Sequence, residues 1–159
     1  MTKTPHLTHI DSRGSARMVD VTTKDVSARA AVASGIVHTT PDVTAAISGD
    51  GLPKGDVLSA ARLAGIMGAK RTPDLIPLCH PIALHGVAVD LEVAESTITI
   101  TARTKTADRT GVEMEALTAV AVAGLTIIDM IKAVDPAATL TDVGVLAKDG
   151  GKTGSWRRP

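Results

Sequence analysis

The feature that most constrains the fold is a long apolar segment, GVEMEALTAVAVAGLTIIDMIKAV, at residues 111–134. At about 100° per residue, one face of a helix over this segment would collect six residues: Leu117, Val120, Gly124, Ile127, Ile128 and Ile131. The opposite face mixes Glu115, Thr118, Asp129 and Lys132 with Met114, Ala121, Val122 and Leu125. An ordinary amphipathic surface helix is the more common explanation of such a pattern. A helix that is apolar nearly all round has both faces covered, so its charges are expected to be paired or used in chemistry.

The segments around this helix predict an α+β fold. Strands are expected at 29–38, 84–93, 97–103 and 140–147, where β-branched residues or alternating apolar residues occur. Helices are expected from the Thr40–Pro41–Asp42 start, with the threonine hydroxyl as cap, and over residues 57–71. Three prolines exclude a long regular element at 71–81. The order of elements is that of the ferredoxin-like split βαβ fold: a four-stranded antiparallel sheet with helices on one face.

No repeat or linker divides the chain, so residues 1–159 are expected to form one domain. Residues 1–27 are polar and predict an extended arm with at most one short strand around 16–21. Residues 148–159 predict a basic loop and tail.

Composition excludes several classes of function. Basic and acidic residues both number 17, and the only aromatic residue is Trp156, so nucleic-acid binding is not expected. One cysteine permits neither an intrachain disulfide nor a thiolate-rich metal site. No apolar run is expected to be long enough to cross a bilayer and the N-terminus lacks a signal-peptide pattern, so a soluble cytoplasmic protein is expected.

The glycine-rich loop 147–155 is a candidate anion site. It is not a Walker A loop, because Leu146 stands where that motif needs glycine. Backbone N–H groups and the ammonium groups of Lys148 and Lys152 could nevertheless bind an anion. A mobile basic tail is the alternative.

A second candidate is Leu78–Cys79–His80, which lies between two prolines. Prolines reduce the entropy lost when His80 is ordered, and histidine suits anion contact or proton transfer near neutral pH. A packed turn in which His80 bonds a carbonyl group is the alternative. Apolar neighbours indicate an inert Cys79, and no partner at ligand spacing supports a metal site.

Four charged residues complete the candidates. Lys54 lies at a helix entry, where a bound anion would offset its unfavourable interaction with the helix dipole. Asp129 and Lys132 are spaced to pair on one helix. Glu115 shares their face but lies about 21 Å away along the axis, so a small ligand would need a second subunit to reach both ends.

These segments together resemble the MoaC family, the cyclic pyranopterin monophosphate synthases of molybdenum-cofactor biosynthesis. The matching runs cover nearly the whole chain: LTHID at 7–11, MVDV at 18–21, KGDV at 54–57, ARLAGIMGAKRTPDLIPLCHP at 61–81, TGVEMEALTA at 110–119, IDMIKAV at 128–134 and LAKDGGKTG at 146–154. Ile131 departs from the cysteine expected in many relatives, without bearing on a catalytic role.

The resemblance implies conversion of 3′,8-cyclo-7,8-dihydro-GTP into cyclic pyranopterin monophosphate with release of pyrophosphate, a lyase reaction that follows a radical SAM enzyme. It implies catalytic or substrate-contacting roles for Lys54, His80, Asp129 and Lys132. It also implies substrate contacts from Leu78, Cys79, Met114 and Glu115, and cationic contacts to phosphate from Lys148 and Lys152, with Arg17, Arg62, Lys70 and Arg71 as further candidates. No cofactor or bound metal is implied as required, and Mg²⁺ with the triphosphate is left open. A homohexamer, a trimer of dimers with sites between subunits, is implied.

Two alternatives come from other classes: a ferredoxin-like module that senses a nucleotide without chemistry, and a purely structural oligomerisation subunit. The reactive groups at Asp129, Lys132, Lys54 and His80 exceed what binding requires, which favours the enzyme.

Overall fold

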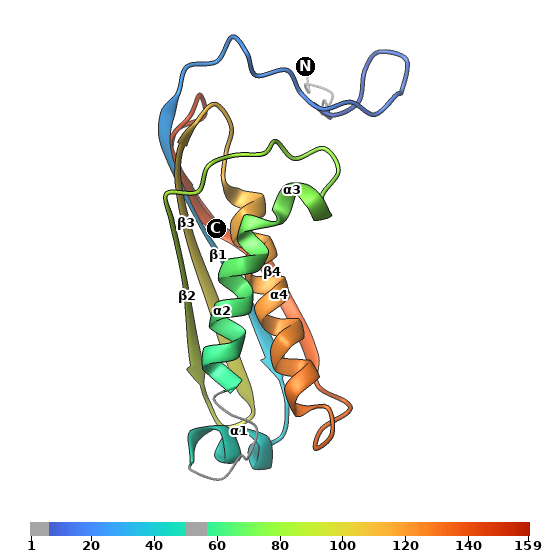
Figure 1. The fold of residues 1–159 in the computed structure, drawn as a ribbon, viewed down its shortest axis with the longest axis vertical. Helices are drawn as coiled ribbons and strands as arrows, with labels where there is room; N and C mark the ends of the chain where they lie inside the picture. The colour runs from blue at the N-terminus through green and yellow to red at the C-terminus, as the bar shows by residue number, and fades with distance from the viewer. Residues whose placement is uncertain (1–6, 50–56) are drawn as a thin grey trace.

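The computed structural model describes residues 7–49 and 57–159 and contains one antiparallel sheet with helices against it (Figure 1). Its strands follow the order β2-β3-β1-β4-β5. The strands are β1 (Ser27–His38), β2 (Gly86–Val93), β3 (Thr97–Asp108), β4 (Thr139–Asp149) and β5 (Trp156–Arg157). The helices are α1 (Pro41–Ser48), α2 (Val57–Lys70), α3 (Thr72–Leu75) and α4 (Glu113–Ile131).

The first four strands confirm the predicted ferredoxin-like arrangement, and β5 adds an edge strand that the sequence did not predict. β5 pairs with β4 through Trp156 and Arg157, and the Arg157 guanidinium bonds both carboxylate oxygens of Asp149. Two residues are too few to show an alternating pattern, so the predicted C-terminal loop and tail gave no sign of a strand. β4 also extends through Lys148 and Asp149, beyond the predicted end at residue 147.

The helices α2 and α4 pack side by side on one face of the sheet (Figure 1), and they touch closely because small residues meet where they cross. A Cβ atom on Gly65 would lie 2.9 Å from the carbonyl oxygen of Ala119 and 3.2 Å from Ala123 Cβ. Only hydrogen fits at this position of α2, since a Cβ atom would press on the backbone of α4. The core between helices and sheet is built from Ala, Val and Ile.

The predicted sheet-facing side of α4 is confirmed over most of its length. Val120, Gly124, Ile127 and Ile131 are buried, and α4 contacts β1, β3 and β4. The predicted polar face is not uniform. Glu115 and Thr118 are buried and Thr118 bonds the carbonyl of its own helix at Met114, whereas Asp129 and Lys132 are exposed.

The prediction that no apolar run approaches the length needed to cross a bilayer is wrong for α4. This helix has 19 residues and is apolar enough to cross a membrane by length and composition alone. The buried side of α4 lies on the sheet, as expected for the core helix of a globular fold.

One smaller prediction needs correction. Thr40 stands at the N-cap of α1 but its side chain makes no capping hydrogen bond; Pro41 begins the helix as predicted. The proline-rich segment contains the four-residue helix α3, which agrees with the prediction that it forms no long regular element. The arm was predicted to have at most one short strand around 16–21; its pairing is a single bridge between Ile10 and Ala16.

Candidate active site

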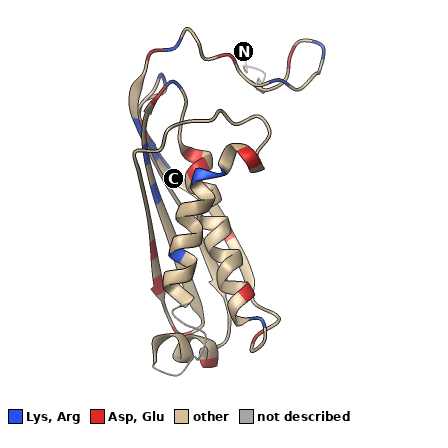
Figure 2. Ribbon diagram, viewed as in Figure 1, with Lys and Arg blue, Asp and Glu red and all other residues tan. Residues whose placement is uncertain are grey.

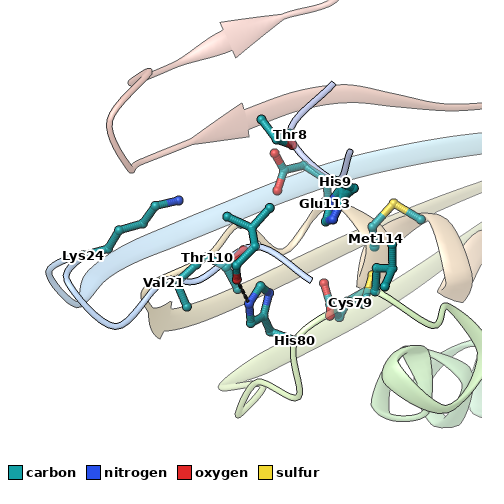
Figure 3. Close-up of a pocket in the computed structure, with 13 residues that line it drawn as sticks. Thr8, His9, Val21, Lys24, Cys79, His80, Thr110, Glu113 and Met114 are labelled. Carbon is teal, nitrogen blue, oxygen red and sulfur yellow. Dashed lines mark hydrogen bonds between the residues drawn. The ribbon is translucent and has the colours of Figure 1, made fainter. Parts of the chain in front are cut away.

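A cavity of about 350 Å³ lies where the N-terminal arm crosses the start of α4 (Figure 3). Three separate segments line it: the arm, the loop at residues 78–80, and residues 110–115. Five of the predicted substrate-binding residues therefore meet in one place: Leu78, Cys79, His80, Met114 and Glu115. Figure 3 shows Thr8 and His9 of the arm on one side and Cys79 and His80 on the other.

His80 is fixed by a hydrogen bond to the arm. Its Nε2 lies 2.6 Å from the carbonyl oxygen of Val19. Because a carbonyl oxygen only accepts, Nε2 carries the proton and donates it. In neutral His80, Nδ1 then carries the lone pair that can accept a proton. The two interpretations of His80 from the sequence are compatible, because the same side chain bonds a carbonyl group and lines a cavity.

Glu115 lines this cavity and is almost completely buried. Only 3 % of the residue is exposed, and burial raises its pKa to about 7. The negative charge on Glu113 adds to that rise. A carboxyl group with this pKa exchanges a proton near neutral pH, which suits acid–base chemistry.

The Cys79 thiol is less reactive than an exposed thiol. Burial raises its pKa, and the charge of Glu115 adds to this effect. A raised pKa lowers the thiolate fraction near neutral pH, in line with the inert cysteine that the sequence indicated.

Lys148 reaches the same end of α4 from the sheet. Its Nζ donates to Oε1 of Glu113 at 2.9 Å, and both side chains are partly shielded from solvent. Glu113, Lys148 and Trp156 also line a neighbouring, more open cavity of about 600 Å³. Lys148 therefore lies on strand β4 and not on the predicted loop, and it lines the second cavity.

Asp129 and Lys132 form the expected ion pair, with Lys132 Nζ 2.6 Å from Asp129 Oδ1. They lie at the opposite end of α4 from Glu115. Since α4 is one continuous helix, the separation along its axis is about 21 Å. One chain does not bring this pair to the cavity.

The other predicted residues are not at the cavity or lie outside the described part of the chain. Lys54 falls outside the described residues. Lys152 is exposed in the turn after β4 and lines neither cavity. The Arg62 Nε donates to the carbonyl of Val89 on β2, where it ties α2 to the sheet. Arg17, Lys70 and Arg71 are exposed and line neither cavity.

The contributions of the arm and of Glu113 to the site were not predicted from the sequence. Eight cavity residues were not predicted as site residues: Thr8, His9, Val19, Val21, Lys24, Thr110, Gly111 and Glu113. A histidine and a lysine in a polar arm were the available signal, but no periodicity shows where an arm folds back. Among residues 7–49 and 57–159, no group of three His, Cys, Asp or Glu residues could hold a metal ion.

Known proteins share these segments. The MoaC family model matches residues 18–151. Cyclic pyranopterin monophosphate synthase from Streptomyces griseus subsp. griseus is 65% identical over 152 residues, which cover 96% of this chain and 86% of the relative. The protein of that name from Nocardioides sp. is 60% identical over 156 residues, 96% of each chain. Cyclic pyranopterin monophosphate synthase 2 from Mycobacterium tuberculosis is 60% identical over 152 residues, 96% of this chain and 91% of the relative. The chain belongs to the MoaC family.

Proposed function

We propose that this protein is a cyclic pyranopterin monophosphate synthase, a lyase that converts 3′,8-cyclo-7,8-dihydro-GTP into cyclic pyranopterin monophosphate and pyrophosphate. Identity of 65% over 96% of the chain to a relative of that name is the observation that carries the proposal. The product of a radical SAM enzyme would be its substrate, and the reaction would take place in the cytoplasm.

The chemistry needs groups that move protons and groups that neutralise phosphate. In the cyclisation a substrate hydroxyl oxygen attacks the α-phosphorus, the bond to the β-phosphate breaks, and pyrophosphate leaves. The hydroxyl proton passes to a base, for which Asp129 paired with Lys132 is the candidate. Cations stabilise the charge that develops on the phosphates, a role proposed for Lys54, Lys148 and Lys152.

The rearrangement of the ring is assigned to the cavity. His80 has a fixed tautomer there, and Glu115 has a pKa of about 7 because it is buried. Two such groups on one cavity can exchange protons with a bound ring in the neutral range. Leu78, Cys79 and Met114 supply the remaining wall.

A second subunit is proposed to complete each site. Asp129 and Lys132 are about 21 Å along α4 from Glu115, too far for one compact reacting centre. The outward sides of α2 and α4 carry few charges (Figure 2) and expose Leu63, Met67 and Leu125 by more than half. Burial of these side chains between copies would offset the cost of their exposure. The proposed assembly is a homohexamer, a trimer of dimers. Light scattering after size-exclusion chromatography measures its mass and tests this proposal.

The deciding experiment incubates purified protein with the cyclised dihydro-GTP and measures pyrophosphate and pterin fluorescence. Release of both supports the synthase. Binding of the nucleotide without release of pyrophosphate supports a nucleotide sensor instead, and absence of binding supports a structural subunit. A parallel reaction with EDTA tests whether the triphosphate needs Mg²⁺: the same rate with and without EDTA means that it does not.

A further inference from the structure

The described part of the N-terminal arm is ordered by hydrogen bonds within it. Residues 7–17 form a small hairpin with the bridge between Ile10 and Ala16. The Arg17 N–H donates to the His9 carbonyl at 2.8 Å, and the Asp11 N–H donates to the Ser15 carbonyl at 2.9 Å. A segment with this much internal bonding has lost part of its conformational freedom before a ligand arrives.

The turn of the hairpin is held by Asp11. Its Oδ1 accepts the backbone N–H groups of Arg13 at 2.8 Å and Ser15 at 2.9 Å. These bonds stabilise the charged carboxylate and hold the pKa of Asp11 below its ordinary value. The arm is also tied to the body of the protein, through the Val19 carbonyl to His80 and through the Lys24 carbonyl to Arg109 Nε at 2.9 Å.

His9 and Thr8 are the residues of this hairpin that line the cavity, and His9 is the one with an imidazole ring. Its Nδ1 lies 3.2 Å from the carbonyl oxygen of Arg17, across the hairpin. The carbonyl only accepts, so Nδ1 carries the proton and the Nε2 of neutral His9 keeps its lone pair. Both ends of the ring are thereby defined: one end stabilises the hairpin, and the other can accept a hydrogen bond.

The hydrogen-bond acceptors of the cavity indicate which part of a nucleotide would lie here. Its wall carries the carboxyl groups of Glu113 and Glu115, and the nitrogen lone pairs of His9 and His80 add two more acceptors. Lys24 also lines the cavity and Lys148 pairs with Glu113, so the case for a ring rests on these acceptors and not on net charge. Hydrogen-bond acceptors take N–H donors as partners. A guanine-derived ring offers such donors along one edge, its exocyclic amino group and the adjacent ring N–H.

We infer that His9 is a substrate-contacting specificity residue, whose Nε2 accepts a hydrogen bond from the guanine-derived ring while the hairpin at residues 7–17 holds the imidazole in place. This inference rests on the proposed function for the identity of the natural substrate, although the predicted contact is to the ring alone. It assigns the arm a direct part in binding.

The test compares three full-length variants. His9→Asn keeps an amide N–H that can donate to the Arg17 carbonyl but has no atom in place of Nε2, and His9→Ala removes both. Arg13→Ala is the matched control, since Arg13 lies in the same hairpin with its side chain 87% exposed. One lost hydrogen bond predicts a KM about tenfold higher for His9→Asn and His9→Ala. The kcat of both variants should stay within about threefold of the wild type, and Arg13→Ala should match the wild type throughout.

Equilibrium binding separates this inference from the proposed function. Calorimetry with GTP as the probe should give a Kd about tenfold higher for His9→Asn, while inhibition or binding by tripolyphosphate stays unchanged. This result supports the inference even if the wild type fails to turn over the cyclised substrate. Wild-type behaviour of His9→Asn with only His9→Ala impaired would overturn it, because the histidine would then serve the hairpin alone. Weakened binding of tripolyphosphate would also overturn it, since the contact would be to phosphate.

Discussion

Glu115 and Asp129 stand on the same helix, yet Glu115 is 3% exposed at its N-terminal end and Asp129 is exposed near its C-terminal end. The helix axis between them spans about 21 Å. Two carboxylates proposed for one reaction therefore face different surroundings in one chain. If they act together, the second one comes from another copy.

Loss of either member of the Asp129–Lys132 pair should abolish turnover without unfolding the protein. An exposed ion pair contributes less than about 1 kcal/mol to stability, so Asp129→Asn and Lys132→Met should leave the urea midpoint nearly unchanged. Removal of a proton-transfer group should lower kcat by about 10²–10⁴-fold, measured as pyrophosphate release.

The matched control for this prediction is Asp90→Asn, which breaks another exposed ion pair, that with Arg103 on the sheet. Its kcat should equal that of the wild type. Full turnover by both Asp129→Asn and Lys132→Met would exclude the pair from catalysis.

Two inactive variants should restore activity to each other if sites are shared between subunits. Co-expressed Glu115→Gln and Asp129→Asn chains would form mixed dimers in which one of two sites has both wild-type residues. Random assembly predicts about a quarter of wild-type activity, against almost none for either variant alone. Activity of the mixture no higher than that of the separate variants would place each site within one chain.

Glu115 should make the protein less stable as the pH rises. Its pKa is raised from 4.5 to about 7 in the folded protein because the carboxyl group is buried. Between these values the folded state binds more protons than the unfolded state, so stability falls with increasing pH across this window. Glu115→Gln cannot ionise and should escape the loss, with a gain over wild type of at most roughly 3 kcal/mol above the window.

Urea denaturation at a series of pH values measures this effect. Below pH 4.5, the pKa of Glu115 in the unfolded state, the difference in the free energy of unfolding between the two proteins should no longer change with pH. Glu92→Gln, at an exposed glutamate on β2, is the control for the loss of a carboxylate at the surface. A constant difference between Glu115→Gln and wild type at every pH would contradict the raised pKa.

Gly65→Ala should weaken the contact between α2 and α4. Alanine favours a helix by about 1 kcal/mol over glycine, but here its Cβ would lie 2.9 Å from the Ala119 carbonyl oxygen. Backbone cannot move aside as a flexible side chain can, so a net destabilisation of about 1–3 kcal/mol is expected in thermal or urea unfolding. Gly86→Ala is the control, because its nearest neighbour would be at an ordinary 3.8 Å. A stabilised Gly65→Ala variant would show that the helices can separate at no cost.

Local patterns predicted most of the regular structure because they depend on neighbours in the chain. Alternation marked the strand that contains Val87, Val89 and Leu91, and the period of a helix marked the face of α4 with Val120 and Ile127. Residues 78–80 were singled out because prolines flank them. These signals are local, and the structure places them where the patterns indicated.

Contacts between distant segments were decided only by the tertiary structure. Val19 and His80 are 61 residues apart, and their hydrogen bond depends on where the arm crosses the fold. Trp156 becomes part of a strand only because β4 offers an unpaired edge. Glu115 and Asp129 belong to the same sequence pattern but differ in burial, because the surroundings of a helix change along its length. The sequence by itself determined the elements and the reactive groups; packing decided which groups share a cavity and which ionise readily, because desolvation and contact depend on neighbours that are remote in the chain.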